Sequence, residues 1–66
     1  MTTVKEGRFD VFIVEIATSK IEAVVGTNLT ADKADRREMT ALSRINDRYF
    51  VVSEPTGVYK KDDILK

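Results

Sequence analysis

The chain has 66 residues, no cysteine, no histidine and a formal net charge of zero. Disulfides and the usual zinc and haem ligands are therefore excluded, and no global field draws the chain toward nucleic acid. A chain of this length forms one domain, residues 1–66, and its core supplies only about 3–5 kcal/mol of net stability. We expect no metal or cofactor, and we expect self-association to stabilise the fold.

Neither a secretory leader nor a membrane segment is visible. Residues 1–11 carry charges where a signal peptide needs an apolar core, and the longest apolar run is far too short to span a bilayer. We expect a cytoplasmic protein with no membrane partner.

The first predicted element is a strand over residues 8–16, preceded by a polar arm, residues 1–7. Side chains alternate along a strand, and both faces of this one are apolar. One face carries Phe9, Val11 and Ile13, and the other carries Phe12, Val14 and Ile16. Both faces need cover. Because only one helix is expected, we predict that Phe12, Val14 and Ile16 form an interface with another copy or a partner protein, without settling which face packs on the helix.

A second strand is predicted at residues 21–25, where Gly26 ends it. The short polar segment 17–20 between the two strands is typical of a hairpin loop.

The clearest element is a helix over residues 31–45. Thr30 or Asn28 can serve as the N-cap, and Asp32 falls in the first turn, where the helix dipole favours a negative charge. The apolar residues occupy one sector of about 100° at helical spacing. They are Ala31, Ala34, Ala41, Leu42 and Ile45.

A third strand is predicted at residues 49–53, followed by a turn at 54–57 that contains Pro55 and Gly57. The turn could return a short fourth strand at 58–60, and residues 61–66 either dock on the body or fray. The fold class is therefore α+β: one helix on an antiparallel sheet of three or four strands, in the order β-β-α-β with a fourth β left open. Whether the third strand pairs with the first or the second is undetermined.

The predicted core combines one face of each strand with the apolar sector of the helix. Its members are Val11, Ile13, Ile21, Ala23, Val25, Leu29, Ala34, Ala41, Leu42, Ile45, Phe50 and Val52.

Glu38 lies in the middle of the helix's apolar sector. An isolated buried carboxylate is costly, so Glu38 is expected to be paired, hydrogen-bonded or moved to the rim. Either it meets an arginine or lysine at the sheet edge, or it is a functional acid or binding anchor.

Basic residues form a stripe that the helical angles place on the solvent side, and Lys33, Arg37 and Arg44 could contact an anionic partner such as a phosphate backbone. Arg36 also lies there but can pair with Asp32 one turn earlier. A solvated charged face is the alternative interpretation.

Enzyme chemistry has few candidate residues in this chain. It lacks histidine for proton transfer and cysteine as a nucleophile, and no base is visible for Ser19, Ser43 or Ser53. We therefore expect a protein that is not an enzyme.

The layout of two strands, then NLTADKADRREMTAL, then a strand and PTG resembles that of many small proteins encoded by phages and prophages. Leu29, Thr30 and Ala34 are the positions that align. The resemblance implies a bacterial or phage cytoplasm and a protein that binds a host protein or another macromolecule, and it assigns no functional residue. The main hypothesis is a protein–protein interaction module acting as a homodimer or on a host protein. The alternative is a small nucleic-acid-binding protein that uses the basic helix face.

Overall fold

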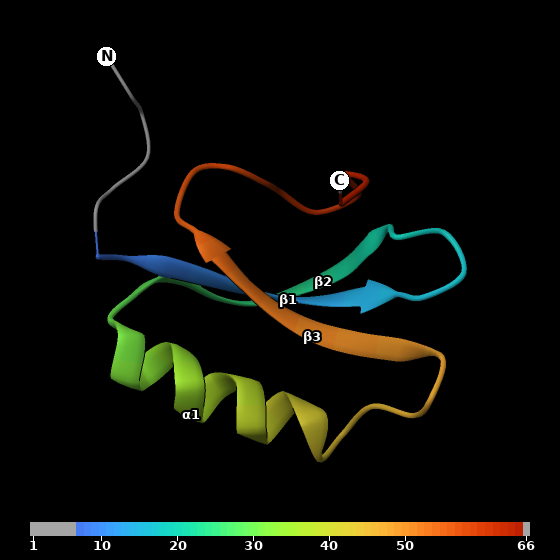
Figure 1. Ribbon diagram of the computed structural model, residues 1–66, viewed down its shortest axis with the longest axis horizontal. Helices are drawn as coiled ribbons and strands as arrows, with labels where there is room; N and C mark the ends of the chain where they lie inside the picture. The colour runs from blue at the N-terminus through green and yellow to red at the C-terminus, as the bar shows by residue number, and fades with distance from the viewer. Residues whose placement is uncertain (1–6, 66) are drawn as a thin grey trace.

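A computed structural model of the chain describes residues 7–65. Its elements follow the predicted order. They are β1 (Phe9–Glu15), β2 (Ile21–Leu29), α1 (Ala31–Leu42) and β3 (Tyr49–Pro55). Figure 1 shows α1 on one side of the sheet and the segment after β3 on the other. The α+β class and the β-β-α-β order are confirmed.

The sheet has three antiparallel strands in the order β2-β1-β3. The third strand therefore pairs with the first, which the sequence left undetermined. The β1–β3 register is regular from Phe9 opposite Pro55 to Glu15 opposite Tyr49. The pairing of β1 with β2 is interrupted by three register shifts, so it is less regular than the pairing of β1 with β3.

The prediction that Gly26 ends the second strand is wrong. β2 continues through it to Leu29, and Gly26 pairs with Val11 between two of the register shifts. A Cβ atom at Gly26 would lie 2.6 Å from Cδ1 of Leu29 and 3.4 Å from Cγ of Arg37. Glycine thus permits a close approach of side chains inside the strand.

Thr30 is the N-cap of α1, and its hydroxyl accepts a hydrogen bond from the Lys33 N–H at 3.4 Å. The helix ends at Leu42 rather than Ile45. The N–H of Arg44 donates to the carbonyl of Ala41, and the hydroxyl of Ser43 donates to the carbonyl of Thr40. These i→i−3 bonds tighten the last turn and end the α-helix.

The face of α1 that meets the sheet is narrower than predicted. Ala34 and Ala41 are buried, whereas Leu42 is 56% exposed, so its assignment to the core is wrong. Ala34 and Ala41 point in nearly the same direction at 100° per residue, and Leu42 lies about 100° away from Ala41. Glu38 is half-buried, and within residues 7–65 it forms no ion pair.

The rest of the predicted core is confirmed to different degrees. Val11 and Ile21 are buried with almost no exposed surface. The remaining members are half-buried: Ile13, Ala23, Val25, Leu29, Ile45, Phe50 and Val52.

The second face of β1 is covered by the chain itself, which corrects the predicted interface. Phe12 is 1% exposed and Val14 is 0% exposed, so neither is available to a partner. They form a cluster with Ile21, and partly buried residues pack against it. These are Phe50, Val52, Tyr59 and Leu65. Only Ile16, at 55% exposure, remains accessible among the three predicted interface residues.

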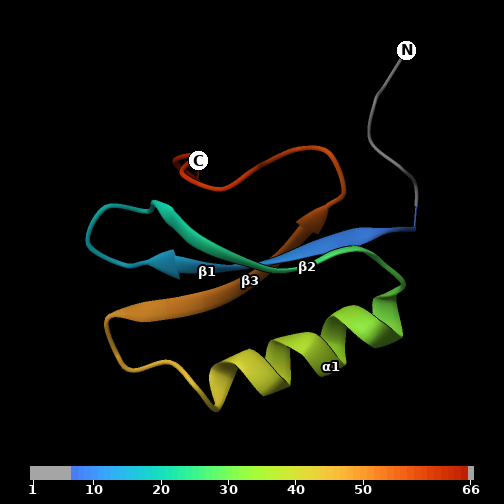
Figure 2. The ribbon, with the colours of Figure 1, turned by 180° about the vertical axis from the view of Figure 1, so that it is seen from behind.

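The cover consists of residues 56–65, here named the C-terminal segment. In both ribbon views it crosses the sheet face opposite α1 (Figures 1 and 2). The ring of Tyr59 meets that of Phe12 edge to face, with centroids 6.4 Å apart. No fourth strand forms at 58–60, because the segment crosses the face instead of extending the sheet. The alternative of a docked tail is confirmed for residues 61–65, whereas the predicted arm 1–7 lies outside the described residues except for Gly7.

Backbone hydrogen bonds attach the C-terminal segment to the start of β2. The Ile21 N–H donates to the Asp63 carbonyl, and the Asp62 N–H donates to the Ile21 carbonyl, both at 2.9 Å. A surface ion pair joins Lys20 to Asp62 at 3.6 Å. The outer edge of β2 is therefore occupied at Ile21.

Asp10 is buried at the other end of the segment and has hydrogen bonds on both carboxylate oxygens. Oδ1 accepts from the Asn28 N–H at 2.9 Å and the Thr56 hydroxyl at 2.8 Å. Oδ2 accepts from the Gly57 N–H at 3.4 Å. One carboxylate thus joins β1 to the end of β2 and to the turn where the C-terminal segment begins.

Candidate functional site

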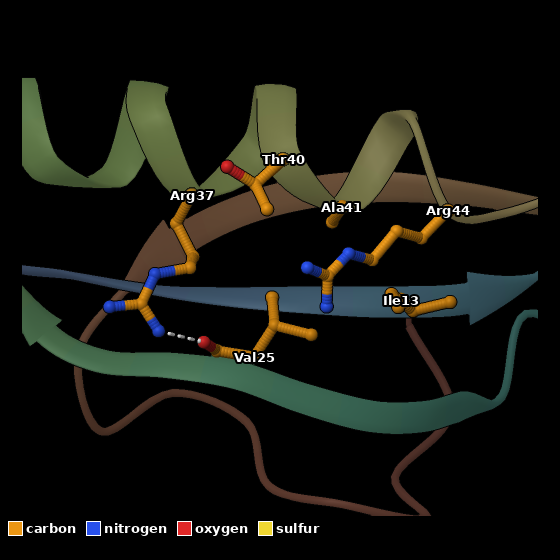
Figure 3. A pocket seen from close by; sticks show the side chains of 6 residues that line it. All are labelled: Ile13, Val25, Arg37, Thr40, Ala41 and Arg44. Carbon is orange, nitrogen blue, oxygen red and sulfur yellow. Dashed lines mark hydrogen bonds between the residues drawn. The ribbon is translucent and has the colours of Figure 1, made fainter.

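A groove of about 390 Å³ lies between α1 and β2. Its lining consists of Ile13, Val25, Arg37, Thr40, Ala41 and Arg44. Figure 3 shows the side chain of Arg37, from α1, and that of Arg44, from the turn just after α1, reaching toward Val25 and Ile13. The volume lies in the range typical of ligand pockets, about 300–1,000 Å³.

The two arginines enter this groove from α1 and from the turn that follows it. Arg37 lies on α1, whereas Arg44 lies two residues beyond its last residue, Leu42, in the turn where the Arg44 N–H donates to the Ala41 carbonyl. The buried direction of the helix is that of Ala34 and Ala41, and Arg37 lies about 60° from Ala34, on the flank over β2. The prediction that they face away from the sheet is therefore corrected: both are exposed but line the groove.

Arg37 is held in place by the β2 backbone. Its Nη1 donates to the carbonyl oxygen of Val25 at 2.6 Å (Figure 3). Val25 lies at the register shift between the Val24 and Gly26 pairs, which leaves it out of the β1–β2 ladder. The guanidinium thus pairs with the carbonyl of a residue that the β1–β2 register skips.

Arg44 differs, because its guanidinium has no hydrogen-bond or ion-pair partner within residues 7–65. Among the described residues, no acidic side chain lines the groove. The hydroxyl of Thr40 is engaged by the helix, where it donates to the Arg36 carbonyl at 3.0 Å. One unpaired cation therefore stands beside an apolar floor, and the arrangement suits a carboxylate that carries apolar atoms.

The opposite flank of α1 is acidic. A smaller hollow of about 100 Å³ lies there, lined by Phe9, Ala31, Ala34, Asp35, Glu38 and Ser53. Charges on the helix are thus segregated: the basic flank lies over β2 and the acidic flank over β3. Asp32 and Arg36, predicted to pair, form no ion pair in the described part of the chain.

Ser53 lies in that acidic hollow, and its buried hydroxyl has no hydrogen-bond partner among the described residues. A serine nucleophile needs a base within hydrogen-bond reach. Asp35 and Glu38 line the same hollow but form no hydrogen bond with Ser53. Within residues 7–65, Ser53 therefore lacks the hydrogen-bonded base that a serine nucleophile needs.

The structure brings together two of the predicted anionic-partner contacts and leaves the third apart. Arg37 and Arg44 share the groove, whereas Lys33 does not line it. Sequence reasoning placed the arginines on one stripe but missed Ile13 and Val25 beneath them. The spacing of the arginines in the sequence indicated that they share a stripe. The position of Ile13 and Val25 beneath them depends on which flank of α1 lies over β2, which the sequence does not show.

No family model, curated protein or solved structure matches the chain. Among the described residues, no helix is long and apolar enough to cross a membrane, and no cluster of potential ligands could hold a metal ion. A function has to be inferred from the chemistry of the groove.

Proposed function

We propose that the protein is a non-catalytic interaction module that binds an acidic segment of a partner protein in the α1–β2 groove. The observation that carries the proposal is the guanidinium of Arg44, which has no partner within residues 7–65 and lies beside the apolar side chains of Ile13 and Val25. A glutamate or aspartate pairs with the guanidinium, and a neighbouring apolar side chain covers the floor. Charge-assisted pairs of this kind are the stronger hydrogen bonds in proteins.

The groove favours a protein segment over nucleic acid for two reasons. Its floor is apolar, whereas binding of a phosphate backbone depends on the number of cations. The net charge of the chain is zero, and the acidic flank of α1 carries Asp35 and Glu38 close to the basic flank. A basic helix face for nucleic acid is the second candidate, since Lys33 continues the stripe of Arg37 and Arg44.

The test uses a capped peptide of alternating glutamate and leucine as the probe, and the same peptide with glutamine in place of glutamate as its control. Affinity is measured by amide chemical shifts of the labelled protein. The glutamate peptide should perturb Ile13, Val25 and Ala41, and the glutamine peptide should bind about tenfold more weakly or not at all.

Three arginine and lysine variants separate the two candidates. Arg44→Gln should weaken the glutamate peptide about tenfold, whereas Arg36→Gln, on the solvent side, should not. Lys33→Gln discriminates further, because it lies outside the groove and matters only to a phosphate backbone. If single-stranded DNA binds with strong salt dependence, and Lys33→Gln weakens it as much as Arg44→Gln does, the nucleic-acid function replaces the one proposed.

A further inference from the structure

The outer edge of β3 differs from the outer edge of β2. On β2, residues 62 and 63 pair with Ile21, and Arg37 occupies the carbonyl of Val25. On β3, no described residue forms a backbone hydrogen bond with the outward groups of Val51 or Ser53. A strand edge left unpaired is a template for a further strand.

The hydrogen bonds between β1 and β3 determine which backbone groups of β3 point outward. The Ile16 N–H donates to the Arg48 carbonyl, and the Thr56 N–H donates to the Arg8 carbonyl. Both bonds keep the register of the β1–β3 ladder. Because bonded and non-bonded pairs alternate in an antiparallel ladder, the even-numbered residues of β3 face β1. The N–H and C=O groups of Tyr49, Val51 and Ser53 therefore point away from the sheet.

We propose that β3 pairs antiparallel with β3 of a second copy of this chain, with the twofold axis at Val51. Val51 then exchanges two hydrogen bonds with its own copy. Each Ser53 N–H donates to the Tyr49 carbonyl of the other copy, whereas the Tyr49 N–H already donates to Asn46 within its own turn at 3.3 Å. The result is a continuous six-stranded sheet.

Charge complementarity selects this register. With the axis at Val51, Arg48 of each copy lies opposite Glu54 of the other. Within residues 7–65 neither side chain has an ion-pair partner in its own chain. An axis moved to Val52 would place Glu54 opposite Phe50, and Pro55, which has no N–H, opposite Tyr49.

The exposed apolar residues of α1 lie on the side that such a dimer covers. Leu42 follows Glu38 by four residues and Asp35 by seven, and both of these line the hollow beside β3. Leu42 is 56% exposed, and Met39, one turn before it, is 72% exposed. A twofold axis perpendicular to the sheet puts both helices on the same face. Leu42 and Met39 of the two copies then approach each other above the joined edges.

Sedimentation equilibrium at tens to hundreds of micromolar tests the proposal through a charge-reversal series. Arg48→Glu and Glu54→Arg each create two like-charge pairs and should weaken the dimer about tenfold or more. The double variant Arg48→Glu/Glu54→Arg recreates two opposite-charge pairs and should restore the wild-type constant. Far-UV circular dichroism confirms that each variant is folded.

A monomeric wild type at these concentrations would overturn the proposal, and so would a double variant no better than either single one. Leu42→Gln should also weaken the dimer. If Leu42→Gln weakens the dimer while the charge-reversal variants do not, the two copies associate through their helices, and the β3 register is refuted. Affinity for the glutamate–leucine peptide should not change in the charge series, because the groove lies over β2, so this test is independent of the proposed function.

Discussion

At the scale of single residues, Asp10 is a buried polar group that joins segments distant in the sequence. It lies within an apolar strand, is 5% exposed and accepts hydrogen bonds from residues 18, 46 and 47 positions away. A buried carboxylate is tolerated only when its lone pairs are satisfied. Here three donors satisfy it, and the same bonds fix the start of the C-terminal segment.

Asp10→Asn should lower the free energy of unfolding by about 1–3 kcal/mol. The amide still accepts bonds at one oxygen, but it loses the negative charge and sets an NH₂ group against one of the donors it faces. Urea unfolding followed by circular dichroism measures the change. Asp47→Asn is the matched control: Asp47 is exposed in the α1–β3 turn, and its substitution should cost less than about 0.5 kcal/mol. Equal effects of the two substitutions would contradict the role assigned to Asp10.

Asp10 also shows what sequence reasoning can and cannot find. A charge inside a run that is apolar on both faces signals that the charge must be satisfied. Its donors could not be identified, because Asn28, Thr56 and Gly57 are distant in sequence, and Asn28 lies beyond Gly26, where the second strand was predicted to end.

At the scale of elements, the C-terminal segment replaces the partner that the two-sided apolar strand was expected to need. It has no helical or strand period, and its two inward side chains, Tyr59 and Leu65, are six residues apart. Such spacing carries no pattern from which docking can be predicted. The helix and the hairpin, by contrast, were predictable because periodicity, a cap at Thr30 and a polar interruption marked their bounds.

Leu65→Ala should destabilise the protein by about 1–2 kcal/mol, because Leu65 packs against the cluster of Phe12, Val14 and Ile21. Its neighbour provides the control, since Ile64 is 52% exposed and Ile64→Ala removes little buried surface. Thermal unfolding of the two variants at one protein concentration makes the comparison. A larger loss for Ile64→Ala would show that the segment lies on the sheet in a different register.

The groove arises at this same scale, from the way in which α1 lies on the sheet. A helix centred on Ala34 and Ala41 brings its basic flank over β2, whereas one centred on the predicted sector would have turned Arg37 and Arg44 toward solvent. The face of α1 that lies on the sheet is determined by the close packing of Ala34 and Ala41. Helical periodicity alone does not distinguish this narrow face from the wider apolar sector.

At the scale of the whole molecule, the fold requires no second copy to cover its core. Phe12→Ala should therefore lower the free energy of unfolding by about 3–5 kcal/mol even at low protein concentration, where any dimer has dissociated. Ile16→Ala, a substitution on the same predicted face, should cost less than about 0.5 kcal/mol, because Ile16 is 55% exposed. If both substitutions lowered the free energy of unfolding by similar amounts, the result would instead support the interface of Phe12, Val14 and Ile16 predicted from the sequence.

The central functional claim is that an acidic segment pairs with Arg44 in the α1–β2 groove. The side-chain Nε–Hε resonances of the arginines, recorded during titration with the glutamate–leucine peptide, test it most directly. We predict a large shift and slowed solvent exchange for Arg44, a smaller shift for Arg37, whose Nη1 already binds Val25, and no change for Arg36. An unshifted Arg44 resonance, or an equal shift of all three arginines, would contradict the claim.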